Sequence, residues 1–376
     1  MEWKTIGLTL LVVSLCLLAI PIHVNNGPEE KLAASSGTEI QDAEAKVVKL
    51  FESYVAEHKK PYRNNPSEYQ KRFAVFQQSL QKIEKMNRLR SSNDSARYGI
   101  TKFSDMTEEE FLASNLRSDI PVRSEKHRNC EYHHTHSKGR RSKRAAIITA
   151  PAVGLPLKFD WRDQGVVTAV KSQGTCGACW AFSSIEVAES MFAISNKTLY
   201  AFSVQEMIDC AKNSNFGCEG GDICSLLEWL VATKTKILPE VSYPLTRTTD
   251  TCRIPKKSDK SEPGVRISDF TCDNFVDAED ELMRQIVTKG PVAAAVNALT
   301  WQNYLGGVIQ YHCDGSFASL NHAVQIVGYD MTGATPHYLV RNSWGTKFGD
   351  QGYIYIAIGS NLCGIANQVS TLDVVY

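Results

Sequence analysis

The sequence predicts an α+β protein in which a helical segment precedes a larger domain made of two subdomains. Between about residues 41 and 90, apolar side chains recur every three or four positions, a spacing typical of amphipathic helices. Residues 180–194 contain no Gly or Pro and predict a further helix. Short β-type runs separated by Gly or Pro then follow near the C-terminus, at residues 323–329, 337–340 and 353–357.

Length and charge narrow the function classes. The chain has 376 residues, of which 41 are basic and 41 acidic. This length suggests two or three structural units. A zero net charge argues against a dedicated nucleic-acid-binding protein, which usually carries a basic excess.

The N-terminal residues predict entry into the secretory pathway. Residues 1–24 combine a short polar head with an apolar stretch, as in a signal peptide, although a retained signal anchor is the alternative. Residues 25–39 are polar and predict a spacer. The expected destination is the lysosome or the exterior, where disulfides persist. Two sequons, at Asn93 and Asn196, are compatible with glycosylation on this route.

Residues 117–144 are rich in Lys, Arg and His and poor in core-forming side chains. This stretch predicts an exposed linker whose final basic run, ending at Arg144, is a processing site. A nucleic-acid or heparin patch is the alternative for the basic run. A metal site is the alternative for the histidines, but their spacing fits no closed zinc pattern, so no metal is expected.

One constellation predicts nucleophilic catalysis. Residues 173–183 hold a Cys-Gly-Ala-Cys-Trp sequence in which Cys179 opens the predicted helix, where exposed N–H groups favour a thiolate. Downstream, His322 precedes an apolar strand and would act as the base, while Asn342 would fix its tautomer. The Gln173 amide and the Cys179 N–H would bind an oxyanion, and Trp344 would shield the His–Asn bond.

Each of these residues also has a structural interpretation. Cys179 could be half of a disulfide, His322 a hydrogen-bonded structural residue, and Asn342 a turn former. The order and spacing of all three together favour catalysis.

From about Leu155 to Tyr376 the chain resembles the papain family of cysteine peptidases. The resemblance implies a helical left subdomain and a β-barrel-like right one, separated by the active cleft, and we assign residues 145–376 to this domain. It is carried by five motifs: Phe159-Asp160-Trp161-Arg162, the 173–183 block, Gly217-Cys218-Glu219-Gly220-Gly221, Asn321-His322-Ala323 and Asn342-Ser343-Trp344-Gly345.

Residues 40–116 resemble the inhibitory propeptide of the cathepsin L group. Two positions depart from the family motifs, since Ser79 and Thr101 stand where Asn is usual. The resemblance implies that this segment packs on the enzyme and crosses its cleft. The matching residues are Glu68, Arg72, Val75, Phe76, Ile83, Asn87, Gly99, Phe103 and Asp105.

The resemblance also implies the substrate-binding residues. The pocket for the P2 side chain would be mostly apolar and would favour Leu, Val or Phe, although the polar Gln368 argues against a strong aromatic preference. No long insertion separates Cys218 from Tyr243, where carboxydipeptidases of the family carry an occluding loop, so we expect an endopeptidase. The substrate-binding residues would be Gly220, Gly221, Asp222, Ile223, Ala295, Leu320, Ala323, Trp344 and Gln368.

Family resemblance pairs most of the cysteines that follow Arg144. It implies the bridges Cys176–Cys218, Cys210–Cys252 and Cys313–Cys363. Cys224 and Cys272 are left over and could form a fourth bridge by parity, although the sequence does not show that they are close.

The resulting hypothesis is a monomeric cysteine endopeptidase made as a secretory zymogen. Its partners are protein and peptide substrates and its own propeptide, with a membrane only if the N-terminal segment is retained. No cofactor is expected. The alternative is a non-catalytic binding protein that has kept a peptidase fold, which the presence of Cys179, His322, Asn342 and Gln173 disfavours.

Overall fold

The computed structural model describes residues 37–116, 154–253 and 264–376. The chain divides into two units, residues 1–53 and 54–376, and helix α2 (Gly37–Glu57) spans their boundary. Its first turn therefore begins within the predicted spacer. No helix among the described residues is both long and apolar enough to cross a membrane.

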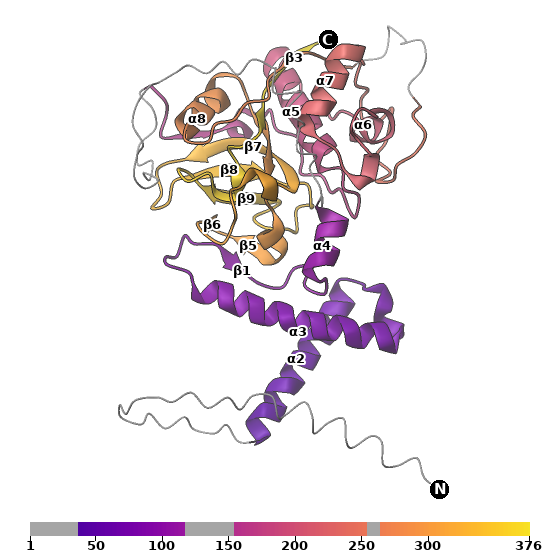
Figure 1. The fold of residues 1–376 in the computed structure, drawn as a ribbon, viewed down its shortest axis with the longest axis vertical. Coiled ribbons are helices and arrows are strands. Elements are labelled where there is room, and N and C mark those ends of the chain that lie inside the picture. Colours follow the sequence, from indigo (N-terminus) through magenta and orange to yellow (C-terminus); the bar gives the residue numbers. More distant parts are fainter. Residues whose placement is uncertain (1–36, 117–153, 254–263) are drawn as a thin grey trace. The chain divides into compact units, whose positions relative to one another are not determined.

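In the second unit most helices precede most strands along the chain, as predicted (Figure 1). Its helices are α3 (Pro66–Arg88), α4 (Glu108–Asn115), α5 (Cys179–Asn196), α6 (Val204–Cys210), α7 (Ile223–Thr233) and α8 (Glu279–Thr288). Its main strands are β2 (Lys158–Asp160), β4 (Val292–Val296), β6 (Val308–Ile309), β7 (His322–Asp330), β8 (His337–Arg341), β9 (Tyr353–Ala357) and β10 (Val369–Ser370).

These seven strands form one sheet in the order β10-β4-β7-β8-β9-β6, with β2 added along β7. All neighbours are antiparallel except β6 and β9. Two further pairs join β1 (Arg97–Tyr98) to β5 (Tyr304–Gly306) and β3 (Arg266–Phe270) to β11 (Leu372–Val375). The β1–β5 pair connects the propeptide to the enzyme domain.

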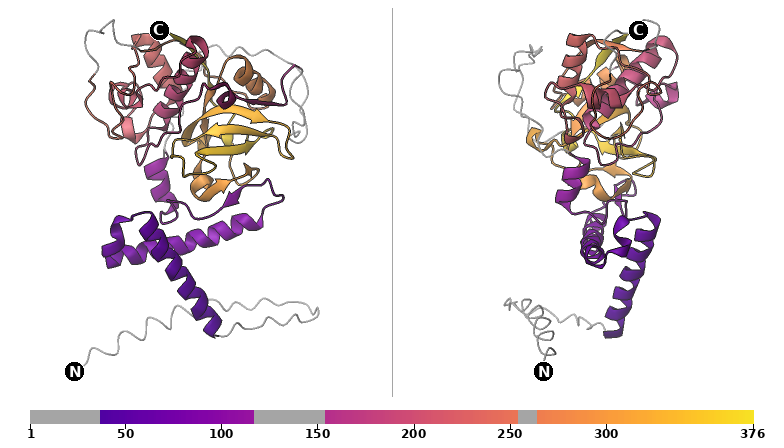
Figure 2. Two further views of the ribbon diagram at one scale, coloured as in Figure 1. Left: turned by 180° about the vertical axis from the view of Figure 1, so that it is seen from behind. Right: turned by 90° about the vertical axis from the view of Figure 1, so that its right-hand side faces the viewer.

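Helix α5 lies between the helical layer and the sheet. Almost all of its side chains are buried, because it packs against α6 and α7 on one side and against β4 and β7 on the other. Figures 1 and 2 show these helices gathered on one side of the β7–β8–β9 sheet. The α+β fold with two subdomains is thus confirmed, and the start of α5 lies at the boundary between them.

Local sequence explains where the propeptide helices begin. Asn65 caps α3 by accepting from the Glu68 N–H at 3.3 Å, and Pro66 occupies the first turn. Thr107 and Glu110 form a reciprocal capping box at α4. In each helix a capping side chain therefore satisfies one of the orphan N–H groups of the first turn.

Candidate active site

Cys179 is the first residue of α5, and a constrained loop leads into it. A disulfide joins Cys176 to Cys218, and the Gly177 N–H donates to the Cys218 carbonyl at 2.7 Å. A Cβ at Gly177 would lie 2.6 Å from that carbonyl oxygen, so only glycine allows this approach. The loop thus fixes the Cys179 sulfur at a helix N-terminus, where the backbone favours its thiolate form.

His322 and Asn342 form a hydrogen-bonded pair. The His322 Nε2 lies 2.8 Å from Asn342 Oδ1, which also accepts from the Ser343 N–H at 2.8 Å. Because a backbone N–H can only donate, the shared atom is the amide oxygen, and His322 must carry its proton on Nε2. The neutral imidazole therefore keeps a lone pair on Nδ1, which has no hydrogen-bond partner among the described residues.

Aromatic rings enclose this imidazole. The Trp344 ring lies 4.9 Å from it and the Trp301 ring 6.1 Å from it, centroid to centroid. His322 is 2% exposed. Burial lowers the pKa of His322 to about 4, an effect that the hydrogen bond donated to Asn342 Oδ1 partly offsets. The imidazole of the zymogen is therefore neutral at physiological pH.

Gln173 is held rigidly beside the same loop. Its Oε1 accepts from Ser343 Oγ at 2.6 Å, and its backbone N–H donates to the Ser343 carbonyl at 2.8 Å. The amide Nε2 donates to the Cys176 carbonyl at 2.9 Å and to the carbonyl of Asn115, in the propeptide, at 3.3 Å. The side-chain amide thus already faces a peptide carbonyl oxygen.

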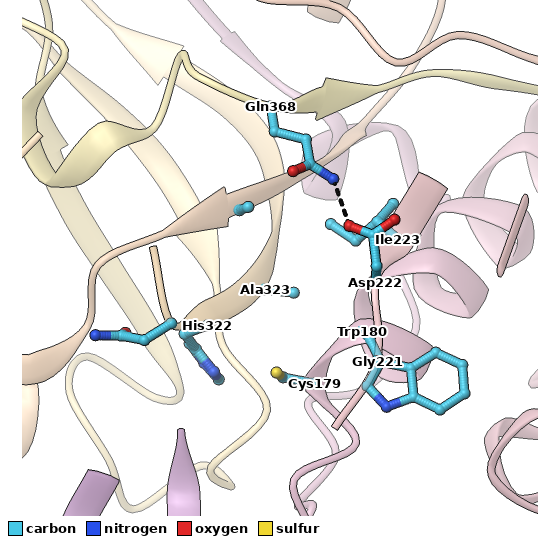
Figure 3. A pocket seen from close by; sticks show the side chains of 10 residues that line it. Cys179, Trp180, Gly221, Asp222, Ile223, His322, Ala323 and Gln368 are labelled. Carbon is cyan, nitrogen blue, oxygen red and sulfur yellow. Dashed lines mark hydrogen bonds between the residues drawn. The ribbon is translucent and has the colours of Figure 1, made fainter. Parts of the chain in front are cut away.

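A small pocket opens between the helical side and the sheet side. In Figure 3 the Cys179 sulfur and the His322 ring face each other across it. Gln368 Nε2 donates to Asp222 Oδ2 at 2.8 Å over the far end, while Asp222 Oδ1 caps α7 through the Ser225 N–H at 2.8 Å. The lining residues are Cys179, Trp180, Gly221, Asp222, Ile223, Ala295, Asn321, His322, Ala323 and Gln368.

The pocket includes most of the predicted substrate-binding residues, with some differences. Gly220, Leu320 and Trp344 lie outside its lining. Leu320 is 3% exposed, and Trp344 packs on His322 instead. Trp180 and Asn321 line the pocket but were not predicted, although each adjoins a predicted catalytic residue in the sequence.

The propeptide covers Trp344 with aromatic side chains. Phe103 and Phe111 lie 5.5 and 5.4 Å from the Trp344 ring, and Lys102 Nζ donates to the Trp344 carbonyl at 2.8 Å. Next to them, Gln302 Nε2 donates to the carbonyls of Phe103 and Met106. This packing joins the propeptide to the hydrophobic core that contains Trp301 and Trp344, the two rings beside His322.

Polar contacts complete this interface. Thr101, which departs from the family motif, donates from Oγ1 to the Gln302 carbonyl at 2.6 Å. Ser104 Oγ donates to Asn303 Oδ1 at 2.8 Å, and both residues are at least 98% buried. The departure at Thr101 is therefore accommodated by a direct hydrogen bond to the enzyme domain.

A buried carboxylate organises the propeptide itself. Asp105 is 3% exposed and pairs with Lys60 Nζ at 2.7 Å. It also accepts from the hydroxyls of Tyr54 and Tyr62 at 2.7 and 2.6 Å. In a second ion cluster, Arg72 pairs with Glu68 and Glu110.

Four disulfides lie in the described part of the enzyme domain. They join Cys176 to Cys218, Cys210 to Cys252, Cys313 to Cys363, and Cys224 to Cys272. The last pair, which sequence parity suggested, has Cα atoms 6.1 Å apart. Cys179 is the described cysteine that belongs to none of these bridges.

The remaining predicted sites lie at the surface or outside the described residues. Asn93 is exposed in the turn between α3 and β1, and Asn196 is the half-buried last residue of α5. Arg144, the histidine-rich stretch of residues 127–136 and the N-terminal residues 1–24 fall outside the described part of the chain.

Two families match the chain. Residues 155–372 match the papain family cysteine protease, and residues 51–111 match the cathepsin propeptide inhibitor domain. Cathepsin O of Homo sapiens is 41% identical over 310 residues, covering 82% of this chain and 90% of that protein. A viral cathepsin of Epiphyas postvittana nucleopolyhedrovirus is 33% identical, covering 87% of this chain and 92% of the viral protein.

Solved precursor structures share the fold. Digestive procathepsin L2 from Tenebrio molitor larval midgut matches with a TM-score of 0.69 and 31% identity, over 87% of this chain and 99% of that one. A recombinant stem bromelain precursor matches with a TM-score of 0.68 and 30% identity, again over 87% and 99% of the two chains.

Proposed function

Because this chain belongs to the papain family of cysteine proteases and carries an inhibitory cathepsin propeptide, we propose that it is a secretory-pathway endopeptidase with Cys179, His322, Asn342 and Gln173 as its catalytic residues. The hydrogen bond between His322 and Asn342 carries the proposal. It leaves the His322 Nδ1 lone pair available in the pocket that also contains the Cys179 thiol.

The proposed reaction begins with transfer of the Cys179 proton to His322 Nδ1. The thiolate then attacks the substrate carbonyl carbon, and the resulting oxyanion accepts from the Cys179 N–H and from Gln173 Nε2. The imidazolium next protonates the leaving amine, which departs and leaves an acyl-enzyme. Water, deprotonated by His322, hydrolyses this thioester and regenerates the thiol.

Substrate choice in the proposal follows from the pocket. Ile223, Ala295 and Ala323 give it apolar walls, while Gln368 and Asp222 bond to each other across its far end. This arrangement supports a preference for Leu or Val over a large aromatic side chain at P2. The short span between Cys218 and Tyr243 supports internal cleavage of polypeptides.

The proposed zymogen is activated by loss of the propeptide. The Asn115 carbonyl accepts a hydrogen bond from the Gln173 side-chain amide, which would bind the oxyanion in the reaction. This contact supports direct obstruction of the site by the propeptide. We further propose cleavage of a signal peptide within the first residues, glycosylation at Asn93 and Asn196, and processing after Arg144 before a second cut nearer Leu155. The lysosome or the exterior is the proposed destination.

Acid treatment of the purified zymogen with a thiol reductant tests this proposal. Hydrolysis of a peptide amide with Leu at P2 should appear after propeptide removal and should be absent in a parallel Cys179→Ala protein. Inactivity of both proteins after demonstrated propeptide removal would instead favour a binding protein that has kept the peptidase fold.

A further inference from the structure

Arg341 is a fully buried charged residue next to the active site. It ends strand β8, directly before Asn342, and its exposed fraction is 0%. A buried guanidinium is costly unless its donors are satisfied. The partners of Arg341 therefore indicate what this side chain holds together.

The partners of the guanidinium come from three other segments. Its Nη1 donates to Gln325 Oε1 at 3.2 Å, and its Nη2 donates to Thr168 Oγ1 at 3.1 Å and to the Ala169 carbonyl. Glu186 Oε1 lies 3.4 Å from Nη2 and forms a buried ion pair with it. At this distance the attraction is mainly electrostatic and requires the ionised carboxylate. Burial raises the pKa of Glu186 to about 7, an effect that the nearby Arg341 opposes.

Each of these segments leads to a proposed catalytic residue. Gln325 lies on β7, which begins at His322, and Glu186 lies on α5, which begins at Cys179. Residues 168–169 precede Gln173 in the same loop. Arg341 itself adjoins Asn342. One side chain therefore connects the segments that contain all four proposed catalytic residues.

A second buried amide reinforces this connection. Gln325 Nε2 donates to the Glu186 carbonyl at 3.0 Å and to Ser190 Oγ at 3.1 Å. Strand β7 is therefore bonded to α5 directly as well as through Arg341. Because β7 and α5 belong to opposite sides of the pocket, these bonds fix the distance between its two walls.

We propose that Arg341 is a positioning residue whose guanidinium, together with Glu186 and Gln325, holds Cys179 and His322 in register across the pocket. The inference rests on the proposed catalytic residues and extends them to the buried groups that align them. Displacing reacting groups by about 1 Å can reduce a rate on the order of 100-fold. Loss of the guanidinium should therefore impair turnover more than substrate binding.

The test compares acid-activated full-length proteins. In the double variant Arg341→Met/Glu186→Leu, apolar side chains replace the whole ion pair, so that no buried charge is left unpaired, an exchange that proteins often tolerate. Arg341→Lys keeps a positive charge and three donors but loses the planar fork. Arg162→Met is the matched control, because Arg162 pairs with Asp160 and stacks on Tyr353 in the same domain.

Two readouts separate positioning from stability. The first is kcat and KM for a peptide amide. The second is the rate of Cys179 alkylation by iodoacetamide from about pH 4 to 8, which follows the thiolate without any substrate. Circular dichroism and thermal unfolding report whether each variant is folded.

We expect the folded double variant to lose about 10- to 100-fold in kcat with KM nearly unchanged, and to show an altered alkylation profile. The kcat of Arg341→Lys should lie between those of the double variant and the unmodified protein. Arg162→Met should keep both the kcat and the alkylation profile of the unmodified protein. An unaltered kcat and profile in the double variant would overturn the inference. Failure of the double variant to fold would also overturn the inference, because the cluster would then be required for folding and not for alignment of the site. An inactive unmodified protein would instead contradict the proposed function.

Discussion

Replacing Asp105 by Asn should open the propeptide at neutral pH. The carboxylate is 3% exposed, pairs with Lys60 at 2.7 Å and accepts from two tyrosine hydroxyls. Asn keeps the shape but removes the charge, so the Lys60 ammonium loses its counter-ion. Breaking a buried ion pair in this way costs about 3–5 kcal/mol, and we expect the lower value because the Lys60 side chain is 15% exposed.

A loss of ~3 kcal/mol corresponds to about a 100-fold larger open population. The assay is the rate of trypsin cleavage within the propeptide at pH ~7, in a Cys179→Ala background that prevents self-cleavage, since cleavage of a transiently opened segment follows its equilibrium population. In the catalytically intact protein, the same substitution should move autoactivation to a higher pH.

Glu108→Gln provides the matched control in the same segment. Its carboxylate pairs with Lys82 at 3.1 Å, but the side chain is 51% exposed. An exposed pair contributes little, so the cleavage rate should change by no more than about twofold. If Asp105→Asn behaved like this control in both assays, the reasoning from the buried ion pair would be wrong.

Three further predictions follow from the site. The folded-state pKa of His322, about 4, lies below its ordinary 6.5, so the stability that the neutral ring contributes is present above pH 6.5 and lost as the pH falls to about 4. Between pH 6.5 and 4, protonation of His322 should lower the unfolding free energy of the zymogen by about 3 kcal/mol, and His322→Gln should abolish this contribution. An unchanged pH dependence of the unfolding free energy would contradict this prediction. Ser104→Ala and Asn303→Ala should each weaken propeptide docking by about 1–3 kcal/mol but be non-additive, whereas additive effects in a double-mutant cycle would refute their coupling. Gln368→Ala should raise kcat/KM for Phe relative to Val at P2 by about tenfold, and an unchanged ratio would show that Gln368 does not limit the pocket.

Several features of this protein are local enough to be predicted from sequence. A stretch without Gly or Pro predicted the helix that begins near Cys179, and short β-type runs between Gly or Pro predicted the three C-terminal strands. The structure contains each of them. The capping residue Thr107 likewise marks the start of α4. Such signals depend on neighbouring residues, so they do not require contacts between distant parts of the chain.

The sequence also indicated the chemistry of the site but not its arrangement. Cys179, His322 and Asn342 were identifiable by residue type and order. The proton position on His322, in contrast, depends on the Ser343 N–H that orients Asn342. Burial of the imidazole, which decides its charge, is likewise a property of the assembled core.

Residue type and spacing thus predicted the fold class and the candidate nucleophile, and the resemblance to the cathepsin L group implied the inhibitory propeptide. Tertiary structure alone decided that Cys224 meets Cys272, that Asp222 bonds Gln368 across the pocket, and that Arg341 joins the segments around the active site. The physical reason is that these contacts join residues far apart in sequence, and their energies depend on distance and on burial. Local propensity specifies neither quantity before the helical and sheet layers have packed together.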